Sequence, residues 1–248
     1  MGQNMDRKIG IIMAAGIGSR MRPITETIPK PMVKVFGKPL IETVIDGLLA
    51  AGVSDIYVVV GYLKESFAAL GEKYPQIKLI VNEDYLEKNN ISSVYAAKDV
   101  LGMGDCFICE ADLLISDSSV FLKNLEESCY FGKMVMGSSD DWAFELKDGY
   151  ISSVKKGGRD TYNMVGISYF TKPDSLILRD KIVEAYGQEE NSNLFWDEVV
   201  DANLQELRLR VESVEEGQIV EIDTVEELLE IDPDAGRQYS GVWREEKF

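Results

Sequence analysis

Histidine is absent from the 248 residues of this chain. The absence excludes nucleophiles that a histidine activates, as in serine and cysteine hydrolases, and it excludes zinc sites with histidine ligands. Any chemistry in this protein must therefore use carboxylates, lysines, arginines, backbone amides and hard metal ions.

Positive charge is also scarce. The chain has 26 Lys and Arg residues against 43 Asp and Glu residues, so its formal net charge is −17. This balance is unlike the basic surface of a nucleic-acid-binding protein and unlike the polybasic segments that hold proteins at membrane surfaces. We therefore expect neither a nucleic-acid nor a membrane partner.

The chain also lacks long apolar runs and has few cysteines. No run is long enough to span a bilayer, and the first residues lack the apolar core of a signal peptide. Two of the three cysteines, Cys106 and Cys109, have a C-x-x-C spacing, but both lie in an apolar run that is typical of a buried strand. We interpret them as reduced core thiols and expect a cytoplasmic protein.

Strand and helix patterns alternate in the first half of the chain, which predicts a parallel sheet with crossover helices. The expected strands there are 9–15, 55–60, 77–81 and 105–109, and the expected helices are 39–51, 63–70 and 91–101. After Ser116 the patterns change to short strands at 131–137, 143–146, 150–154 and 165–170, helices at 173–186 and 195–202, strands at 208–214 and 219–222, and a helix from Thr224. The last residues, 232–248, lack periodicity and are expected to form a loosely held tail.

A glycine-rich segment follows the first strand. Gly16 and Gly18 allow a tight turn in which successive backbone N–H groups can surround an anion. A dinucleotide fingerprint would need a third glycine at position 21, which is Met21, and the spacing of a phosphate-binding P-loop is missing too. The cations that follow, Arg20, Arg22 and Lys30, suit a polyphosphate better than a monoanion.

Two prolines enclose Lys30. Pro29 and Pro31 fix the backbone on either side of this lysine, which indicates that its ammonium group must point in a definite direction. An ordinary strand–helix turn with solvated arginines does not explain this arrangement.

The segments AAGIGSRMRP and IPKPMVKVFGKPLIE resemble the signature of the sugar-phosphate nucleotidyltransferase superfamily. Further along, VNEDYLEKNNISSVYAAKD, EADLLI, NLFWDEVV and VEIDTVEEL resemble segments of bacterial CTP:phosphocholine cytidylyltransferases of the LicC type. The resemblance implies an α/β fold: a single Rossmann-like domain at 7–231 with a mixed, mostly parallel sheet and a small β-rich acceptor-binding subregion at about 131–204.

The same resemblance implies roles for residues of the nucleotide half. Asp112 and Asp223 match the pair that holds Mg²⁺, and Lys30 and Arg20 act with them in catalysis. The implied nucleotide-binding residues are Ala14, Ala15, Gly16, Gly18, Ser19, Arg20, Lys30, Asn82, Asn90, Ser93 and Glu110. From the residues alone, Asp223 or Thr224 could equally be the N-cap of the following helix.

The implied reaction is the transfer of CMP from CTP to phosphocholine with release of pyrophosphate. The acceptor phosphate is already anionic, so in-line attack on the α-phosphorus needs no general base, in agreement with the absence of histidine. Catalysis then consists of positioning and electrostatic stabilisation.

The acceptor site is expected in the second half. Trp142, Trp196, Phe195 and Tyr85 could form an aromatic box for a quaternary ammonium, and Lys155 matches the region where the family places a lysine on the acceptor phosphate. Asp141 and Asp197, with Asp140 beside them, could supply complementary charge. Carboxylates in direct contact would suit a primary amine better, because trimethylammonium has no N–H group to donate.

Several alternatives therefore stay open. The acceptor could be phosphoethanolamine, 2-aminoethylphosphonate, a sugar 1-phosphate or an inositol phosphate in place of phosphocholine. The chain could also be a nucleotide-binding regulatory protein of the same fold, although a complete set of Lys30, Asp112 and Asp223 argues against a sensor. The sequence leaves the oligomeric state open.

Overall fold

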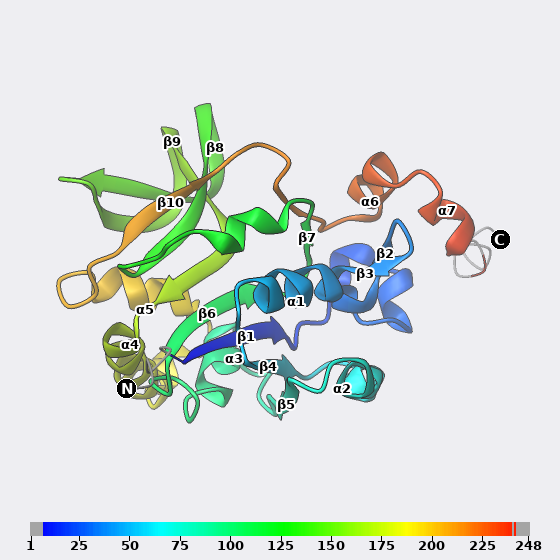
Figure 1. The fold of residues 1–248 in the computed structure, drawn as a ribbon, viewed down its shortest axis with the longest axis horizontal. Helices are drawn as coiled ribbons and strands as arrows, with labels where there is room; N and C mark the ends of the chain where they lie inside the picture. Colours follow the sequence, from blue (N-terminus) through cyan, green and yellow to red (C-terminus); the bar gives the residue numbers. More distant parts are fainter. Residues whose placement is uncertain (1–6, 240, 242–248) are drawn as a thin grey trace, which may run out of the picture.

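The structure is a computed structural model, and it describes residues 7–239 and 241. Its described residues contain a seven-stranded sheet in the order β10-β8-β9-β6-β1-β4-β5 (Figure 1). These strands are β1 (Lys8–Ala14), β4 (Asp55–Val60), β5 (Ile77–Val81), β6 (Asp105–Glu110), β8 (Cys129–Lys147), β9 (Tyr150–Phe170) and β10 (Arg210–Val214).

The sheet is mixed and mostly parallel, as the sequence predicts. β1 lies between β4 and β6 and is parallel to both, and β5 continues the parallel part beyond β4. β9 is antiparallel to both of its neighbours, β6 and β8, while β10 is parallel to β8. The switch in direction at β9 separates the parallel half from the β8–β9 half.

Helices cover both faces of the sheet. The α-helices are α1 (Leu40–Ala50), α2 (Ala68–Lys73), α3 (Ile91–Ala96), α4 (Lys172–Tyr186), α5 (Trp196–Ala202), α6 (Val225–Ile231) and α7 (Ala235–Gln238). Because side chains alternate along a strand, Ile12 of β1 packs with α1 and α2, whereas Ile9 and Ile11 pack with α3, α4 and α5. Each face of the sheet therefore has its own hydrophobic core.

The fold also contains short helical and strand elements. The 3₁₀ helices are η1 (Ser19–Met21), η2 (Ile24–Glu26), η3 (Lys30–Met32), η4 (Lys64–Phe67), η5 (Ser118–Leu122) and η6 (Glu189–Asn191). Two small antiparallel pairs complete the fold, β2 (Lys34–Val35) with β3 (Lys38–Pro39), and β7 (Leu113–Ile115) with β11 (Ile219–Glu221). The second pair brings the segment after β11 next to the segment after β6.

The predicted short strands of the second half merge into two long ones. β8 and β9 run almost continuously through positions expected to be turns, and Figure 1 shows them rising away from the parallel sheet. Gly137 and Gly157, which fall in or beside the gaps between the expected strands, have φ values of 86° and 81° and lie where the pairing register shifts. They mark β-bulges and not chain reversals.

The expectation of a loose tail is wrong for its described part. Residues 235–238 form α7, which lies beside α6 and the β2–β3 pair (Figure 1). The backbone N–H of Lys34 donates to the Tyr239 hydroxyl, and that of Phe36 donates to the Asp232 carboxylate. Tyr239 is buried, so this segment is part of a third hydrophobic cluster; positions 240 and 242–248 lie outside the described residues.

Two further expectations concern thiols and membranes. Cys106, Cys109 and Cys129 are free and buried, which confirms that the C-x-x-C spacing belongs to a core strand. Over 7–239 and 241, none of the helices has the length and apolar character needed to cross a membrane.

Candidate active site

The glycine loop begins where β1 ends at Ala14. Gly18 has φ 65° and ψ 39°, a left-handed conformation that a side chain disfavours, and a Cβ there would lie 2.7 Å from the Cβ of Lys30. The Thr25 hydroxyl donates to the Gly18 carbonyl at 2.8 Å and fixes the turn. A Cβ on Gly16, by contrast, would meet no atom within 4 Å, so Gly16 leaves open space beside the loop.

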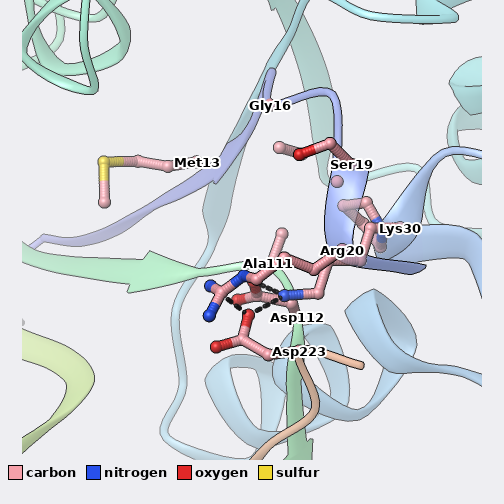
Figure 2. A pocket seen from close by; sticks show the side chains of 11 residues that line it. Met13, Gly16, Ser19, Arg20, Lys30, Ala111, Asp112 and Asp223 are labelled. Carbon is pink, nitrogen blue, oxygen red and sulfur yellow. Dashed lines mark hydrogen bonds and ion pairs between the residues drawn. The ribbon is translucent and has the colours of Figure 1, made fainter. Parts of the chain in front are cut away.

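Lys30 lies at the centre of a charge cluster (Figure 2). Its side chain is buried, and its Nζ is 2.5 Å from Oδ2 of Asp112 and 2.5 Å from Oδ1 of Asp223. Asp112 follows β6 and Asp223 follows β11, so the chain brings them together across 111 positions of sequence. Arg20 adds a second cation, with its Nη2 2.7 Å from the same oxygen of Asp223.

The ion pairs determine the charge states of this cluster. Burial alone would lower the pKa of Lys30, but the attraction of Asp112 and Asp223 outweighs it and raises that pKa. Burial also opposes the ionisation of Asp223, yet Lys30 and Arg20 hold its pKa below the usual value. Lys30 and Asp223 are therefore both charged at neutral pH.

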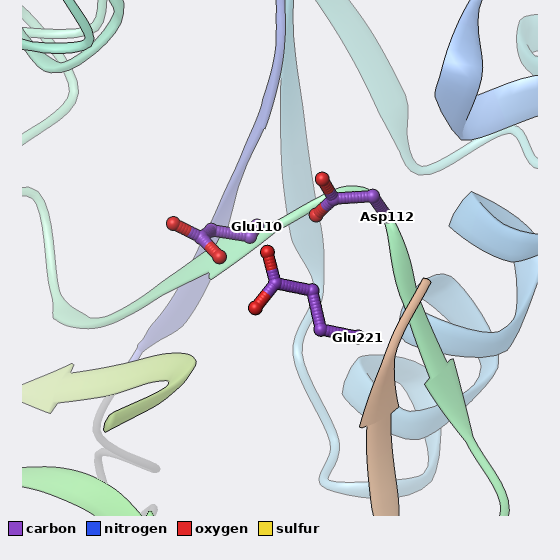
Figure 3. Close-up of side chains that lie close together, drawn as sticks. All are labelled: Glu110, Asp112 and Glu221. Carbon is purple, nitrogen blue, oxygen red and sulfur yellow. The ribbon is translucent and has the colours of Figure 1, made fainter. Parts of the chain in front are cut away.

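Three carboxylates next to this lysine could hold a metal ion. One oxygen from each of Glu110, Asp112 and Glu221 lies within 4.8 Å of the others, and Figure 3 shows these side chains facing one another. Burial and the neighbouring carboxylates raise the pKa of Glu221 to about 8 and that of Glu110 well above its usual value. These carboxylates repel one another because few cations lie beside them. Carboxylate oxygens are also the ligands that a hard cation such as Mg²⁺ prefers.

Both residues of the predicted metal pair lie at this cluster. Asp112 belongs to the carboxylate group, and Oδ1 of Asp223 is engaged by Lys30 and Arg20. Sequence reasoning missed Glu221, the last residue of β11. Its position two residues before Asp223 was the signal that could have found it, because residues i and i+2 of an extended chain lie on the same side.

Two adjoining cavities gather the predicted nucleotide-binding residues. The first, of about 280 Å³, is lined by Ala14, Gly16, Gly18, Ser19, Arg20, Lys30, Asp112 and Asp223. The second, of about 310 Å³, is lined by Ala15, Asn82, Tyr85, Asn90, Ser93, Glu110 and Glu221 together with Gly16, Arg20 and Asp112. The shared residues make the two cavities one continuous cleft at the carboxyl ends of β1 and β6.

Asn82 organises one wall of this cleft. The side chain is buried, and its Nδ2 donates to the hydroxyls of Ser92 at 2.8 Å and Ser93 at 3.2 Å. Its Oδ1 accepts the backbone N–H of Asp84, so most of the amide's hydrogen bonds are internal. Asn90 is likewise engaged, because its Oδ1 accepts the backbone N–H of Trp196. The hydrogen bonds of both amides therefore stabilise the conformation of this wall of the cleft.

A larger cavity, of about 540 Å³, continues the cleft towards β8 and β9. It is lined by Arg20, Glu110, Asp140, Asp141, Trp142, Lys156, Met164, Gly166, Phe195, Glu221, Asp223 and Glu227. The rings of Trp142 and Phe195 meet edge to face at 5.4 Å. The ammonium of Lys156 lies over both rings, 5.6 Å and 5.4 Å from their centroids.

Two predicted acceptor residues belong to the core. Trp196 is 3% exposed and packs on Tyr130 and Phe170, with ring centroids 5.8 Å and 6.2 Å apart, so it does not line the cavity. Asp197 is buried as well and accepts the hydroxyl hydrogen of Tyr130 at 2.9 Å. Burial raises the pKa of Asp197 to about 7. The aromatic box that the sequence predicts is not assembled.

Lys155 and Tyr85 are also placed differently from the prediction. Lys155 pairs with Glu145 at 2.5 Å on an exposed surface, because neighbouring side chains in β9 point to opposite faces. Lys156 is the lysine that faces the cavity, and strand alternation around Trp142 was the signal that could have found it. Tyr85 lines the cavity of Asn82 and not that of Trp142.

Comparisons with known proteins agree with this geometry. The family model described as Nucleotidyl transferase matches residues 9–142. The chain is 52% identical over 232 residues to a 2-aminoethylphosphonate cytidylyltransferase of Lancefieldella rimae, covering 93% of this chain and 94% of the relative. It is 37% identical over 221 residues to a choline-phosphate cytidylyltransferase of Streptococcus pneumoniae, covering 88% and 93%.

A solved structure shows the same fold. The CTP:phosphocholine cytidylyltransferase LicC of Streptococcus pneumoniae superposes with a TM-score of 0.83 at 33% identity, covering 92% of this chain and 98% of that chain. The relatives are enzymes, which disfavours the regulatory alternative. The chain belongs to the nucleotidyl transferase family and is a nucleotidyltransferase similar to cytidylyltransferases.

Proposed function

We propose that this enzyme transfers CMP from CTP to a small primary amine that carries a phosphonate or phosphate group, with 2-aminoethylphosphonate as the leading acceptor. The observation that carries the proposal is the composition of the cavity beside β8 and β9. It has several carboxylates, Asp140 and Asp141 among them, and a single aromatic pair over which Lys156 lies. The relative with 52% identity has 2-aminoethylphosphonate in its name.

The carboxylates favour a primary ammonium for a simple reason. A primary ammonium donates up to three charge-assisted hydrogen bonds, whereas a trimethylammonium donates none. A quaternary ammonium is instead recognised by several aromatic faces. With Trp196 in the core and Lys156 over the rings of Trp142 and Phe195, few aromatic faces are free for it.

The residues of the chain have separate roles in the proposed reaction. The backbone N–H groups of the glycine loop and the cations Arg20 and Lys30 bind the triphosphate and offset the charge of the departing pyrophosphate. Glu110, Asp112, Glu221 and Asp223 would hold Mg²⁺. When bound, the ion supplies charge neutralisation and alignment of phosphate oxygens.

The chemistry balances without a proton transfer to a general base. An anionic oxygen of the acceptor forms a bond to the α-phosphorus of CTP, and the bond from that phosphorus to the bridging oxygen breaks. The electron pair leaves with pyrophosphate. Lys156, which lines the cavity beside β8 and β9, is a suitable cation for the acceptor's phosphonate.

Phosphocholine, the acceptor that the sequence resemblance implies, is the second candidate. The edge-to-face pair of Trp142 and Phe195 supports it, as does the likeness to LicC. A rotation of Lys156 away from the rings would expose one aromatic wall to a quaternary ammonium.

Pyrophosphate release from a matrix of substrates tests the proposal. Four nucleoside triphosphates are each combined with 2-aminoethylphosphonate, phosphoethanolamine, phosphocholine, inositol 1-phosphate and glucose 1-phosphate, with Mg²⁺ present. We expect the highest kcat/KM for CTP with 2-aminoethylphosphonate and a product of the mass of the CMP conjugate. Preference for a sugar phosphate, or for another nucleotide, would contradict the proposal.

A further inference from the structure

Asn163 of β9 has a side chain with one unused hydrogen-bonding atom. The residue is 7% exposed, and its Nδ2 donates to Oγ of Ser139 at 2.6 Å and to Oδ2 of Asp141 at 3.2 Å. Its Oδ1 is buried and has no hydrogen-bond partner, the single such side-chain atom in the part of the chain that the structure describes. An unpaired buried acceptor is destabilising, so its presence calls for an explanation.

The orientation of this amide follows from its neighbours. Rotating the amide by half a turn would place Oδ1 against the carboxylate of Asp141, where two acceptors would repel each other. The amide nitrogen must therefore face Asp141, and the carbonyl oxygen is left without a donor.

Asn163 lies beside the acceptor cavity. It lines a further cavity of about 550 Å³ together with Ser139, Asp141, Met164 and Glu221. Asp141, Met164 and Glu221 line the acceptor cavity too, so the two spaces meet at Asp141. The pairing of β8 with β9 is irregular between Ser139 and Trp142, and such bulges redirect side chains next to active sites.

We propose that Asn163 is a specificity-determining residue that recognises the ammonium group of the acceptor. Its Oδ1 accepts one N–H of a primary ammonium whose positive charge is balanced by Asp141. A quaternary ammonium has no N–H group and would leave Oδ1 unpaired. This inference rests on the proposed function and adds the residue by which the site distinguishes primary from quaternary amines.

Two acceptors that differ only at nitrogen test the inference. These are 2-aminoethylphosphonate and its N-trimethyl derivative, each used with CTP and the wild-type enzyme. We expect the wild type to prefer the primary amine by about 10-fold or more in kcat/KM, the scale expected when a buried polar group is left unpaired. Similar values for the two acceptors, within about 3-fold, would overturn the inference without any variant being needed.

Asn163→Leu removes both polar atoms at similar volume. We expect the KM for 2-aminoethylphosphonate to rise by about 10-fold while kcat stays within about 2-fold, and the N-trimethyl derivative to be unaffected or improved. Ser139→Ala is the matched control, because it removes a partner of Nδ2 and leaves Oδ1 in place. It should preserve the preference for the primary amine.

The outcomes separate the inference from the proposed function. If the wild type uses 2-aminoethylphosphonate and Asn163→Leu keeps the same preference, the inference is wrong and the proposed function stands. If the wild type does not turn over either aminophosphonate, the proposed function itself fails. An equal loss of kcat with both acceptors in Asn163→Leu would indicate a structural role and also overturn the inference.

Discussion

The two halves of the cleft are built in different ways. The nucleotide half lies at the carboxyl ends of β1 and β6, two adjacent parallel strands, and its loops follow those strands directly. The acceptor half lies on β8 and β9, whose pairing has several register shifts, and its walls also include Phe195 ahead of α5. The first half has the geometry that a parallel sheet imposes, while the second depends on local irregularities.

The two halves also differ in how far their polar groups are already paired. In the nucleotide half, Lys30 and Arg20 already neutralise Asp223, so the cations are held in place before a ligand binds. In the acceptor half, Asp141 and Asn163 retain unused capacity to accept hydrogen bonds. This difference implies that the first half sets the rate with any acceptor and that the second half selects the acceptor.

Asp112→Asn should have the largest effect. The substitution removes one charge and little volume, and it should lower kcat/KM by about 1000-fold or more with every acceptor, because it weakens both the metal site and the ion pair with Lys30. Pyrophosphate release and circular dichroism would measure activity and folding. Asp99→Asn, on an exposed side chain, is the control. Near-normal turnover in folded Asp112→Asn would remove the basis of the assignment.

Lys30→Ala should come second, with a loss in kcat of about 100-fold, the scale seen when one preorganised contact to developing charge is deleted. The loss should be the same for 2-aminoethylphosphonate and phosphocholine, because Lys30 belongs to the nucleotide half. Lys34→Ala, on an exposed side chain nearby, should have little effect. An effect confined to the KM of one acceptor would break the division between the halves.

Trp196 and Trp142 should respond differently to replacement by alanine. Trp196→Ala creates a cavity in the core and should lower the free energy of unfolding by about 3–5 kcal/mol. Trp142→Ala should cost less stability, because Trp142 is only partly buried against that core, and it should raise the acceptor KM by about 5-fold with no change for CTP. Urea unfolding of both variants would measure the losses of stability, and steady-state kinetics would measure the KM values for the acceptor and for CTP. Equal losses of stability would mean that Trp142 is a packing residue as well.

Asp197 gives a pH dependence of stability. Its pKa of about 7 in the folded protein exceeds the ordinary value of 3.8, so its contribution to stability is full below about pH 4 and is lost as pH rises through 7. Asp197→Asn carries no charge and should gain stability relative to wild type between pH 4.5 and pH 8, by at most about 4 kcal/mol. Urea unfolding of wild type and Asp197→Asn at pH 4.5 and pH 8 would test this. A difference in the free energy of unfolding between the two proteins that is the same at both pH values would contradict it.

Much of the nucleotide half could be predicted from the sequence. β4 and β5 have the predicted bounds. The β-branched run of β4 identifies a strand buried in a parallel sheet, whereas β5 is the largely exposed edge strand of that sheet. The roles of Lys30, Asp112 and Asp223 in one site are implied by the family resemblance, and the structure brings the three side chains together. The predicted helix at 91–101 is shorter in the structure, since α3 ends at Ala96 and turns with i→i−3 hydrogen bonds follow.

The acceptor half could not be predicted to the same depth. Neighbouring residues such as Lys155 and Lys156, or Phe195 and Trp196, point in different directions, and the direction depends on the register of β9 and the start of α5. Bulges shift that register by single residues, and no local pattern reveals them. Asn163 has significance only through contacts across β8 and β9.

A competition between acceptors tests the central claim most directly. Wild-type enzyme and Asp141→Asn are given CTP, Mg²⁺ and equal concentrations of 2-aminoethylphosphonate and phosphocholine, and the two cytidylyl products are quantified by mass spectrometry. The account predicts that the 2-aminoethylphosphonate product exceeds CDP-choline by about 10-fold or more in the wild type, and that Asp141→Asn lowers this ratio by a similar factor. An excess of CDP-choline, or a ratio that Asp141→Asn leaves unchanged, would contradict it.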